Sequence, residues 1–399
     1  MKISLDNLLK ILLGIFLLNS AGFFSPSFSM RGEDWEAARS VSSNALNRMI
    51  MLSGFMIGIW IVIKSDVYKS LFVLTKSWAL WLLFIFACCS IFWSDLPMVS
   101  TTRLLQQLFL IIFLFSISLK LNEENVIVVF QHIAILTVVF GVICLVVPGA
   151  WQDIGYRGMH GHKNTAGYLY AISSIVLFYS VSMNQKVNKY LLLAFITSIF
   201  LLIITKSKTS LALSIISIFS IHLSAKLSKE QLLRIITFIW ITACCIYVTL
   251  LVVPESQLQD MGINLTGRLI IWQFAISELQ GSELLGVGYR AFWGVGETGI
   301  SVLYGEDYEA FITQLNQVHN SYLDIWVMLG WVGLFVFCLF VCHSFVLISK
   351  SNILFFSILL FLTCHSFMET DFFRSNNYLW VMYVLIYFSS IRLREVSSE

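Results

Sequence analysis

Long apolar runs, separated only by short polar stretches, recur along nearly the whole chain from Leu8 to Ile391. A helix needs roughly 17 to 25 mainly apolar residues to cross a bilayer, and these runs have that length. The pattern predicts an all-α polytopic membrane protein with a single integral membrane domain over residues 1–399. We count about twelve transmembrane helices, near residues 8–24, 47–64, 77–93, 103–119, 125–148, 165–183, 190–205, 209–225, 233–253, 320–346, 352–368 and 376–391.

The composition agrees with this fold class and limits the kinds of molecule that the protein is expected to bind. Of the 399 residues, 58% are hydrophobic and 12% are charged, about half the charged share of an ordinary soluble domain. The net charge of +2 is small and no basic run occurs, so we expect lipid and no nucleic acid as a partner. All eight cysteines lie in apolar runs without a CxxC pair, which indicates packing residues.

The distribution of lysine and arginine predicts the topology. An even number of spans places both termini on one side, and with both cytoplasmic, 14 of the 25 basic residues lie in cytoplasmic segments. The first apolar run resembles a signal peptide, but the even count favours an uncleaved first helix. The other 11 bases lie in or beside loops on the far side, where positive charge is normally scarce. This indicates that some of these bases take part in the protein's chemistry. The 14 bases in the predicted cytoplasmic segments are Lys2, Lys10, Lys64, Lys69, Lys76, Lys120, Lys186, Lys189, Lys226, Lys229, Arg234, Lys350, Arg392 and Arg394.

One loop on the far side is large. Residues 254–319, between the ninth and tenth spans, are predicted to form an extracytoplasmic subdomain with an amphipathic helix near 265–279. Its face would carry Leu269, Trp272, Ile276 and Leu279, although the stripe is imperfect. Such a helix either lies on the bilayer surface or forms a lid over a site, and both can hold together.

Basic residues gather at three places on this predicted face. The stretch "DIGYRGMHGHKNTAGYLY" (153–170) holds Arg157, His160, His162 and Lys163, and Asn164 is placed to cap the sixth span. The short "TKSKTS" turn holds Lys206 and Lys208, and Arg268 begins the helix of the large loop. Arginine and lysine bind phosphate oxygens, so a diphosphate is the natural ligand. The alternative for the two lysines is snorkelling from helix ends.

His319 stands at the end of the large loop in "VHNSYLDIWVMLGWVGLF", with Asn320 beside it. A histidine in a polar loop at the end of a membrane helix is suited to act as a general base, although a lone histidine is commonly structural. His132, His222, His343 and His365 lie inside apolar runs without an adjacent charge and are excluded.

A metal site is a weaker alternative. His160, His162 and His319 could chelate, but no acidic or cysteine ligand is close in sequence and Lys163 would repel a cation. The sequence shows no glycine-rich phosphate loop, HExxH, GxSxG or nucleotide fingerprint, so ATP-driven transport and hydrolysis by those routes gain no support. No cofactor is expected.

Four blocks together resemble a known family. "RGMHGHKNTAGYLY", "KSKTSLALSI", "GRLIIWQFAISELQGSELLGVGYRAFW" and "HNSYLDIWVMLGWVGLF" follow one another in the order found in the O-antigen ligase and Wzy-type polysaccharide polymerase superfamily. "FWSDLPMVSTTRLLQQ" (92–107) is similar to a further segment of that family. The resemblance covers the chain from about residue 90 onward.

The resemblance implies a metal-independent membrane glycosyltransferase of the GT-C type in the bacterial inner membrane. It would transfer glycan from undecaprenyl diphosphate at the periplasmic face, with inversion at the anomeric carbon. His319 matches the family's acceptor-activating histidine, and Arg268 matches the arginine that holds the diphosphate. Lys208 stands where the family has arginine, so the charge is kept and the bidentate fork is lost. The substrate-binding set is completed by Lys206, Arg157, Lys163, His162, Asn164, Asn320 and Arg290.

The acceptor is left open by these motifs. "GHKNTAGY" resembles the exopolysaccharide polymerase branch, which extends a lipid-linked repeat unit, and a chain-length regulator would then be a further partner. The alternatives are an O-antigen ligase acting on lipid A core and an enzyme that glycosylates protein. A transporter of lipid-linked glycan is less favoured, because it should carry charge at mid-membrane depth, whereas the charges here concentrate in loops.

Overall fold

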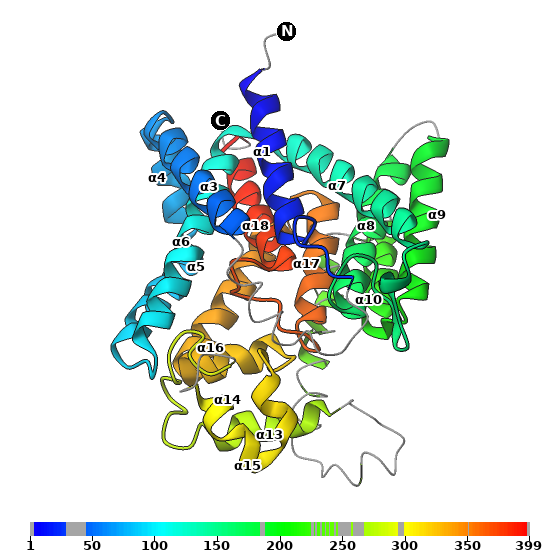
Figure 1. Cartoon of the computed structure of the whole chain (residues 1–399). Coiled ribbons are helices and arrows are strands. Elements are labelled where there is room, and N and C mark those ends of the chain that lie inside the picture. Colours follow the sequence, from blue (N-terminus) through cyan, green and yellow to red (C-terminus); the bar gives the residue numbers. More distant parts are fainter. Residues whose placement is uncertain are drawn as a thin grey trace.

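The computed structural model of the chain describes residues 4–28, 45–183, 188–224, 267–293, 299–349 and 351–396, together with scattered residues between 227 and 257. Helices dominate these ranges (Figure 1). The one sheet within them is a hairpin of β1 (Trp151–Gln152) and β2 (Gly155–Tyr156). The α-helices are α1 (Leu5–Ser20), α3 (Ala45–Ile63), α4 (Val67–Lys76), α5 (Trp78–Cys89), α6 (Pro97–Lys120), α7 (Glu123–Cys144), α8 (Lys163–Met183), α9 (Lys189–Ile204), α10 (Lys208–Leu223), α13 (Arg268–Ser277), α14 (Ile300–Leu303), α15 (Gly305–Tyr308), α16 (Ser321–Ile348), α17 (Ile353–His365) and α18 (Tyr378–Val396).

Five of the described helices, α3, α6, α7, α8 and α16, are long and apolar enough to cross a membrane. The count rises to six if α4 and the segment Trp78–Phe92, bent by 72° relative to each other, form one span. Shorter apolar helices occupy most of the other predicted positions, at Lys189–Ile204, Lys208–Leu223, Ile353–His365 and Tyr378–Ile391. The polytopic, all-α class is therefore confirmed, whereas twelve spans remain a prediction. The ninth predicted span, near 233–253, lies largely outside the described residues.

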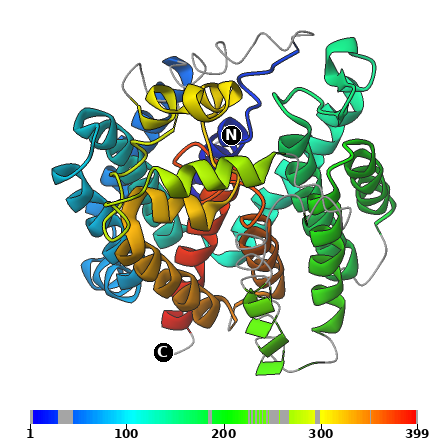
Figure 2. The same ribbon diagram turned by 90° about the horizontal axis from the view of Figure 1, so that it is seen from below.

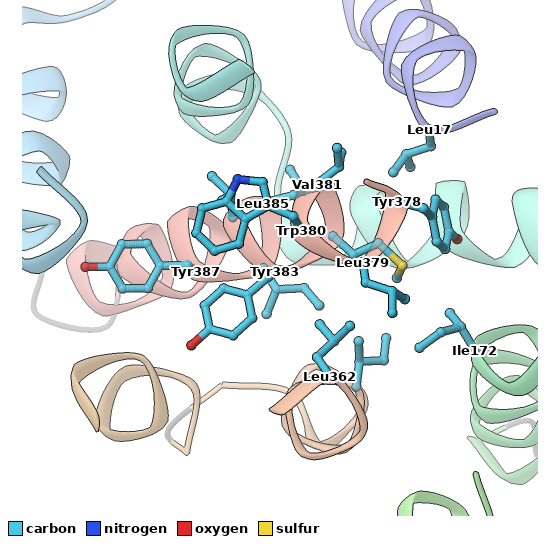
Figure 3. Close-up of a cluster of buried hydrophobic side chains, with 14 of the residues drawn as sticks. Leu17, Ile172, Leu362, Tyr378, Leu379, Trp380, Val381, Tyr383, Leu385 and Tyr387 are labelled. Carbon is cyan, nitrogen blue, oxygen red and sulfur yellow. The ribbon is translucent and has the colours of Figure 1, made fainter. Parts of the chain in front are cut away.

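Helix α18 forms the centre of the bundle. From Tyr378 to Ile391 its side chains are buried on every side, and Tyr378, Trp380 and Tyr383 are each at most 4% exposed. The side chains extend from the helix on several sides, and Leu362 of α17 and Ile172 of α8 lie among the residues around it (Figure 3). A helix that is apolar all round is expected to be enclosed in this way. Helices α1, α4, α6, α7, α16 and α17 contact it directly.

Helix α16 bends where the sequence prediction expected a continuous span. Gly330 has φ 65°, in the left-handed region, and a Cβ there would lie 2.2 Å from the Leu284 carbonyl oxygen. The backbone amide of Trp331 donates to the carbonyl of Glu283 at 2.9 Å. The bend therefore exists because the loop after α13 packs directly on the helix backbone, which only glycine permits.

The described part of the large loop has a core of its own. Leu269, Trp272 and Phe274 of α13 pack with Val318 and with Leu323 from the first turns of α16. Phe274, which is not part of the predicted stripe, is therefore buried together with Leu269 and Trp272 of the stripe. This subdomain lies at the opposite end of the molecule from the start of α1 and the end of α18 (Figure 1), and Figure 2 views the molecule from the subdomain's end.

Candidate active site

Glu369 joins the histidine and the arginine that the sequence analysis placed in the site. Its Oε2 atom lies 3.0 Å from Nδ1 of His319, and its Oε1 atom lies 2.7 Å from Nη2 of Arg268. Oε1 also accepts a 2.7 Å hydrogen bond from Nδ2 of Asn164. One carboxylate in the α17–α18 connection therefore holds together α8, α13 and the start of α16.

The electrostatics of this carboxylate follow from its surroundings. Burial alone would raise the pKa of Glu369, but the hydrogen bond with His319 and the positive charges of His319 and Arg268 outweigh it and lower the pKa to about 2. The group is therefore ionised at neutral pH. It can orient the imidazole and stabilise it once protonated.

His319 is held with one ring nitrogen engaged. Nδ1 contacts Glu369 and lies 3.2 Å from Nε2 of Gln317. Within the described residues, Nε2 of the ring makes no hydrogen bond, and the side chain is 24% exposed. With Nδ1 carrying the proton toward the carboxylate, Nε2 is left as an acceptor that a ligand can reach.

Arg268 starts α13 directly after Gly267, whose φ of 76° turns the chain into the helix. Its Nη1 donates to the sulfur of Met368 at 3.6 Å, beside the ion pair with Glu369. The guanidinium has five donors, so this geometry leaves donors for a further anion.

Asn320 supports the site from beneath and is fully buried. It caps α16 by accepting from the Leu323 amide, and its Nδ2 donates to the Phe367 carbonyl at 2.9 Å. Its own amide donates to Thr370 Oγ1 at 3.2 Å. Asn320 therefore fixes His319 relative to Glu369, and its side chain is already occupied.

The start of α8 differs in one detail from the sequence prediction. Asn164 was expected to cap this helix, but it lies inside it and its side chain reaches Glu369. His162 takes the capping position, because its Nδ1 accepts from the Asn164 amide at 3.2 Å. The pKa of His162 is lowered, first by desolvation and then by cations that include His319, against the opposing charge of Glu369. Lys163 donates from Nζ to the Ile154 carbonyl at 3.1 Å.

Arg157 and His160 lie away from this centre. The buried Arg157 guanidinium donates to the carbonyls of Gly149 at 3.1 Å and Gly161 at 3.2 Å, so it holds the loop's shape. The buried His160 ring packs beside Phe23, and burial lowers its pKa to about 4. The histidine pair of the sequence is thus divided, with only His162 near Glu369.

Lys206 and Lys208 are exposed in the α9–α10 turn. The turn packs against the opening stretch at two glycines: a Cβ on Gly155 would lie 2.3 Å from the Thr205 carbonyl oxygen, and one on Gly167 would lie 2.5 Å from Ser207 Cβ. The structure therefore packs the turn that carries Lys206 and Lys208 against the basic stretch 153–170.

Three predicted site residues have a left-handed backbone. Lys206, Arg290 and His319 have φ values of 56°, 53° and 55°, and Phe373 is the fourth such non-glycine residue in the described ranges. This conformation is strained for residues with a Cβ and is enriched at functional sites. Arg290 is placed in a separate group with Arg103 and Arg374.

His365 requires a correction. It was excluded for want of a neighbouring charge, yet its Nδ1 lies 2.6 Å from Oδ2 of Asp371, and both are buried. Its Nε2 lies 3.4 Å from Ser210 Oγ at the start of α10. Asp371 comes from the same connection as Glu369, so the fold supplies a partner that sequence adjacency did not reveal.

Glu369 itself was missed. The available signal was the segment "METDFFRS", in which two acids and an arginine interrupt apolar sequence on the predicted far side. Among the described residues, no group of three or more His, Cys, Asp or Glu side chains is arranged to hold a metal ion.

Comparisons with known proteins agree with the predicted resemblance. The family model of O-antigen ligase matches residues 193–338. The exopolysaccharide production protein ExoQ of Rhizobium meliloti (strain 1021) is 32% identical over 82 residues, which are 21% of this chain and 19% of that protein. The match therefore spans about a fifth of the relative's length. Residues 193–338 are thus similar to the O-antigen ligase family, and the resemblance of the chain to the O-antigen ligase and Wzy-type superfamily is confirmed.

Proposed function

We propose that the chain polymerises surface polysaccharide by transferring a glycan from undecaprenyl diphosphate to a lipid-linked acceptor at the periplasmic face of the bacterial inner membrane. The observation that carries the proposal is the single carboxylate of Glu369, which contacts His319 and Arg268 at 3.0 and 2.7 Å. A base and a phosphate-binding group are thereby held side by side, as glycosyl transfer from a diphosphate requires.

The base in this proposal is His319. Glu369 fixes the Nδ1 side of the ring, so Nε2 takes the proton of the acceptor hydroxyl as its oxygen attacks the anomeric carbon. Direct attack opposite the leaving group inverts that carbon. Glu369 then stabilises the imidazolium that forms, as the buried carboxylate does in a catalytic triad.

The leaving group is the second half of the chemistry. The bond from the anomeric carbon to the diphosphate oxygen breaks, and its electron pair stays with the diphosphate. Arg268 is the fixed cation nearest the base, and the exposed Lys206 and Lys208 lie on the adjoining turn. Fixed cations of this kind neutralise developing charge without a metal ion or cofactor.

The proposed membrane setting has about twelve spans of the GT-C type with both termini cytoplasmic. It is supported by the positions of the described helices and by the described part of the large loop, which lies at the opposite end from the start of α1 and the end of α18 (Figure 1). The residues that meet at Glu369 come from connections and helix starts, where ionisable groups are best tolerated.

A second candidate is ligation to lipid A core, which the description of the matching family as O-antigen ligase favours. The name of the ExoQ relative, a protein of exopolysaccharide production, favours polymerisation, as does the "GHKNTAGY" motif. Both reactions use the same donor chemistry, so the acceptor distinguishes them.

The test uses a strain lacking this gene and complemented with variants. His319→Ala and Arg268→Ala should abolish surface polysaccharide, whereas His132→Ala, at an exposed position of α7, should restore it fully. The deletion strain should show single repeat units on the lipid core for a polymerase and bare core for a ligase. Polysaccharide of normal amount and length with His319→Ala would refute the enzymatic proposal, and a divalent-metal requirement of reconstituted transfer would refute the metal-free mechanism.

A further inference from the structure

A second group of cations lies beside the first and is not explained by it. Arg103 of α6, Arg290 after α13 and Arg374 of the α17–α18 connection come from three separate parts of the chain. Nη1 of Arg103 donates to the Arg290 carbonyl, so α6 is tied to the large loop at this point. We call these three residues the arginine cluster.

Hydrogen bonds around Tyr289 set the position of the cluster. The Tyr289 hydroxyl donates to the Phe373 carbonyl at 2.6 Å, and Ser100 Oγ donates to the Tyr289 carbonyl at 2.9 Å. The residues before Arg290 and Arg374 are thus bonded to each other, and Arg103 lies one turn after Ser100. Tyr289 is fully buried, so this arrangement is built into the fold.

The cluster has more positive than negative groups. Asp324, in the first turn of α16, is its one close carboxylate among the described residues, 3.2 Å from Nη2 of Arg374. Nε of Arg374 is buried without a hydrogen-bond partner there, and the Arg290 guanidinium donates no hydrogen bond to any described residue. Three guanidinium groups therefore share one acid.

Among the described residues no further acid offsets this imbalance, so an anion bound at the cluster would stabilise the protein. Desolvation, followed by the charges of Arg374 and Arg103, lowers the pKa of Arg290 to about 9. Arginine still carries its charge at neutral pH, so repulsion persists in the free protein. Clustered, strained and repelling groups of this kind are typical of binding sites.

We infer that the arginine cluster is a second anion site, which binds the diphosphate of the lipid-linked acceptor while Arg268 serves the diphosphate of the donor. The inference rests on the proposed function, because only a polymerase has two diphosphate-linked substrates. Both sites are built on the same two segments, since Asp324 follows His319 at the start of α16 and Arg374 follows Glu369. Two diphosphates would thus be held at neighbouring positions with the acceptor glycan between them.

The first experiment measures binding and needs no turnover. The full chain in phosphatidylcholine nanodiscs is titrated with farnesyl diphosphate, and the wild type should bind two molecules. Arg290→Gln should remove one of them or weaken it at least tenfold, and Arg268→Gln should affect the other. Arg48→Ala, an exposed arginine of α3, should leave both unchanged. A single site in the wild type, or two sites indifferent to Arg290→Gln, would overturn the inference.

Two further measurements separate the alternatives. Inorganic diphosphate should compete at both sites, whereas loss of one site in phosphatidylglycerol nanodiscs would show that an ordinary lipid headgroup occupies the cluster and would overturn the inference. Arg290→Gln should melt no lower than the wild type, because it removes repulsion and no hydrogen bond. A lower melting temperature would assign Arg290 a structural role instead.

Kinetics distinguish this inference from the proposed function. If the wild type transfers no glycan, the proposed function fails, while the binding result stands by itself. If transfer occurs, Arg290→Gln should raise the KM for a diphosphate-linked acceptor about tenfold and leave the donor KM within twofold. An equal rise in both KM values would contradict separate sites.

Discussion

Nδ1 of His319 lies 3.0 Å from Oε2 of Glu369, although the two residues are 50 positions apart and belong to different connections. The second oxygen of that carboxylate contacts Arg268, so one acid contacts both the proposed base and the proposed phosphate-binding residue. A mechanism built only on His319 and Arg268 would therefore be incomplete, because their relative position depends on Glu369.

Glu369→Gln is expected to abolish most transfer. The amide keeps the shape of the side chain but carries no charge, so it neither selects the Nδ1–H tautomer nor stabilises the imidazolium. We expect a loss of kcat of ~10²- to 10⁴-fold, the range typical of general acid–base groups. Reconstituted transfer with labelled donor measures it, with Glu306→Gln, at an exposed position of α15, as the control. Retention of near-normal kcat would rule out the Glu369–His319 pair.

The same residue predicts a pH window for stability. The pKa of Glu369 is lowered from 4.5 to about 2, so its ionised form stabilises the folded state fully above about pH 4.5. This contribution, about 3 kcal/mol at 1.36 kcal/mol for each pKa unit, is lost progressively as the pH falls from 4.5 to 2. Melting temperatures of wild type and Glu369→Gln should differ by a constant amount from pH 7 to 5 and converge below 4.5. Convergence already between pH 7 and 5 would contradict the assignment.

Apolar run length predicted the class of fold and most of the helices, because burial in lipid depends on local composition. The bend at Gly330 could not be found in this way. It depends on the carbonyl of Leu284 lying against the helix, a contact across 46 residues that leaves no periodic trace in the sequence. Helix α4 likewise appeared in a segment that was treated as a cytoplasmic connection.

The site was predicted in its parts and missed at its centre. His319 and Arg268 could be named because a histidine and an arginine at loop positions are chemically conspicuous. Glu369 could not, because a carboxylate in a loop is ordinary until its partners are known. Conversely, Arg157 looked like a ligand-binding arginine, and the structure shows its guanidinium bonded to the carbonyls of Gly149 and Gly161.

Gly167→Ala tests whether the opening stretch positions the two lysines. The added Cβ would lie 2.5 Å from Ser207 Cβ, so the α9–α10 turn must move and carry Lys206 and Lys208 with it. We expect transfer to fall at least tenfold while helical content, measured by circular dichroism, is unchanged. Gly161→Ala is the matched control, because no atom lies within 4 Å of its added Cβ. Equal activity of the two variants would show that the turn's position is unimportant.

His160→Gln should alter acid stability and leave catalysis intact. Burial lowers the pKa of His160 from 6.5 to about 4. As the pH falls below 6.5, His160 therefore becomes protonated in the unfolded chain but stays neutral in the folded chain. The wild type should therefore lose about 3 kcal/mol of stability between pH 6.5 and 4 from this residue, at 1.36 kcal/mol for each pKa unit. The variant lacks this loss, and its melting temperature should fall less steeply over that range than the melting temperature of wild type or of His132→Gln, which changes an exposed histidine. Polysaccharide synthesis by His160→Gln near pH 7 should be normal, because the buried ring packs beside Phe23 and His160 is not one of the residues that contact Glu369. Loss of synthesis with unchanged acid stability would instead place His160 in the substrate site.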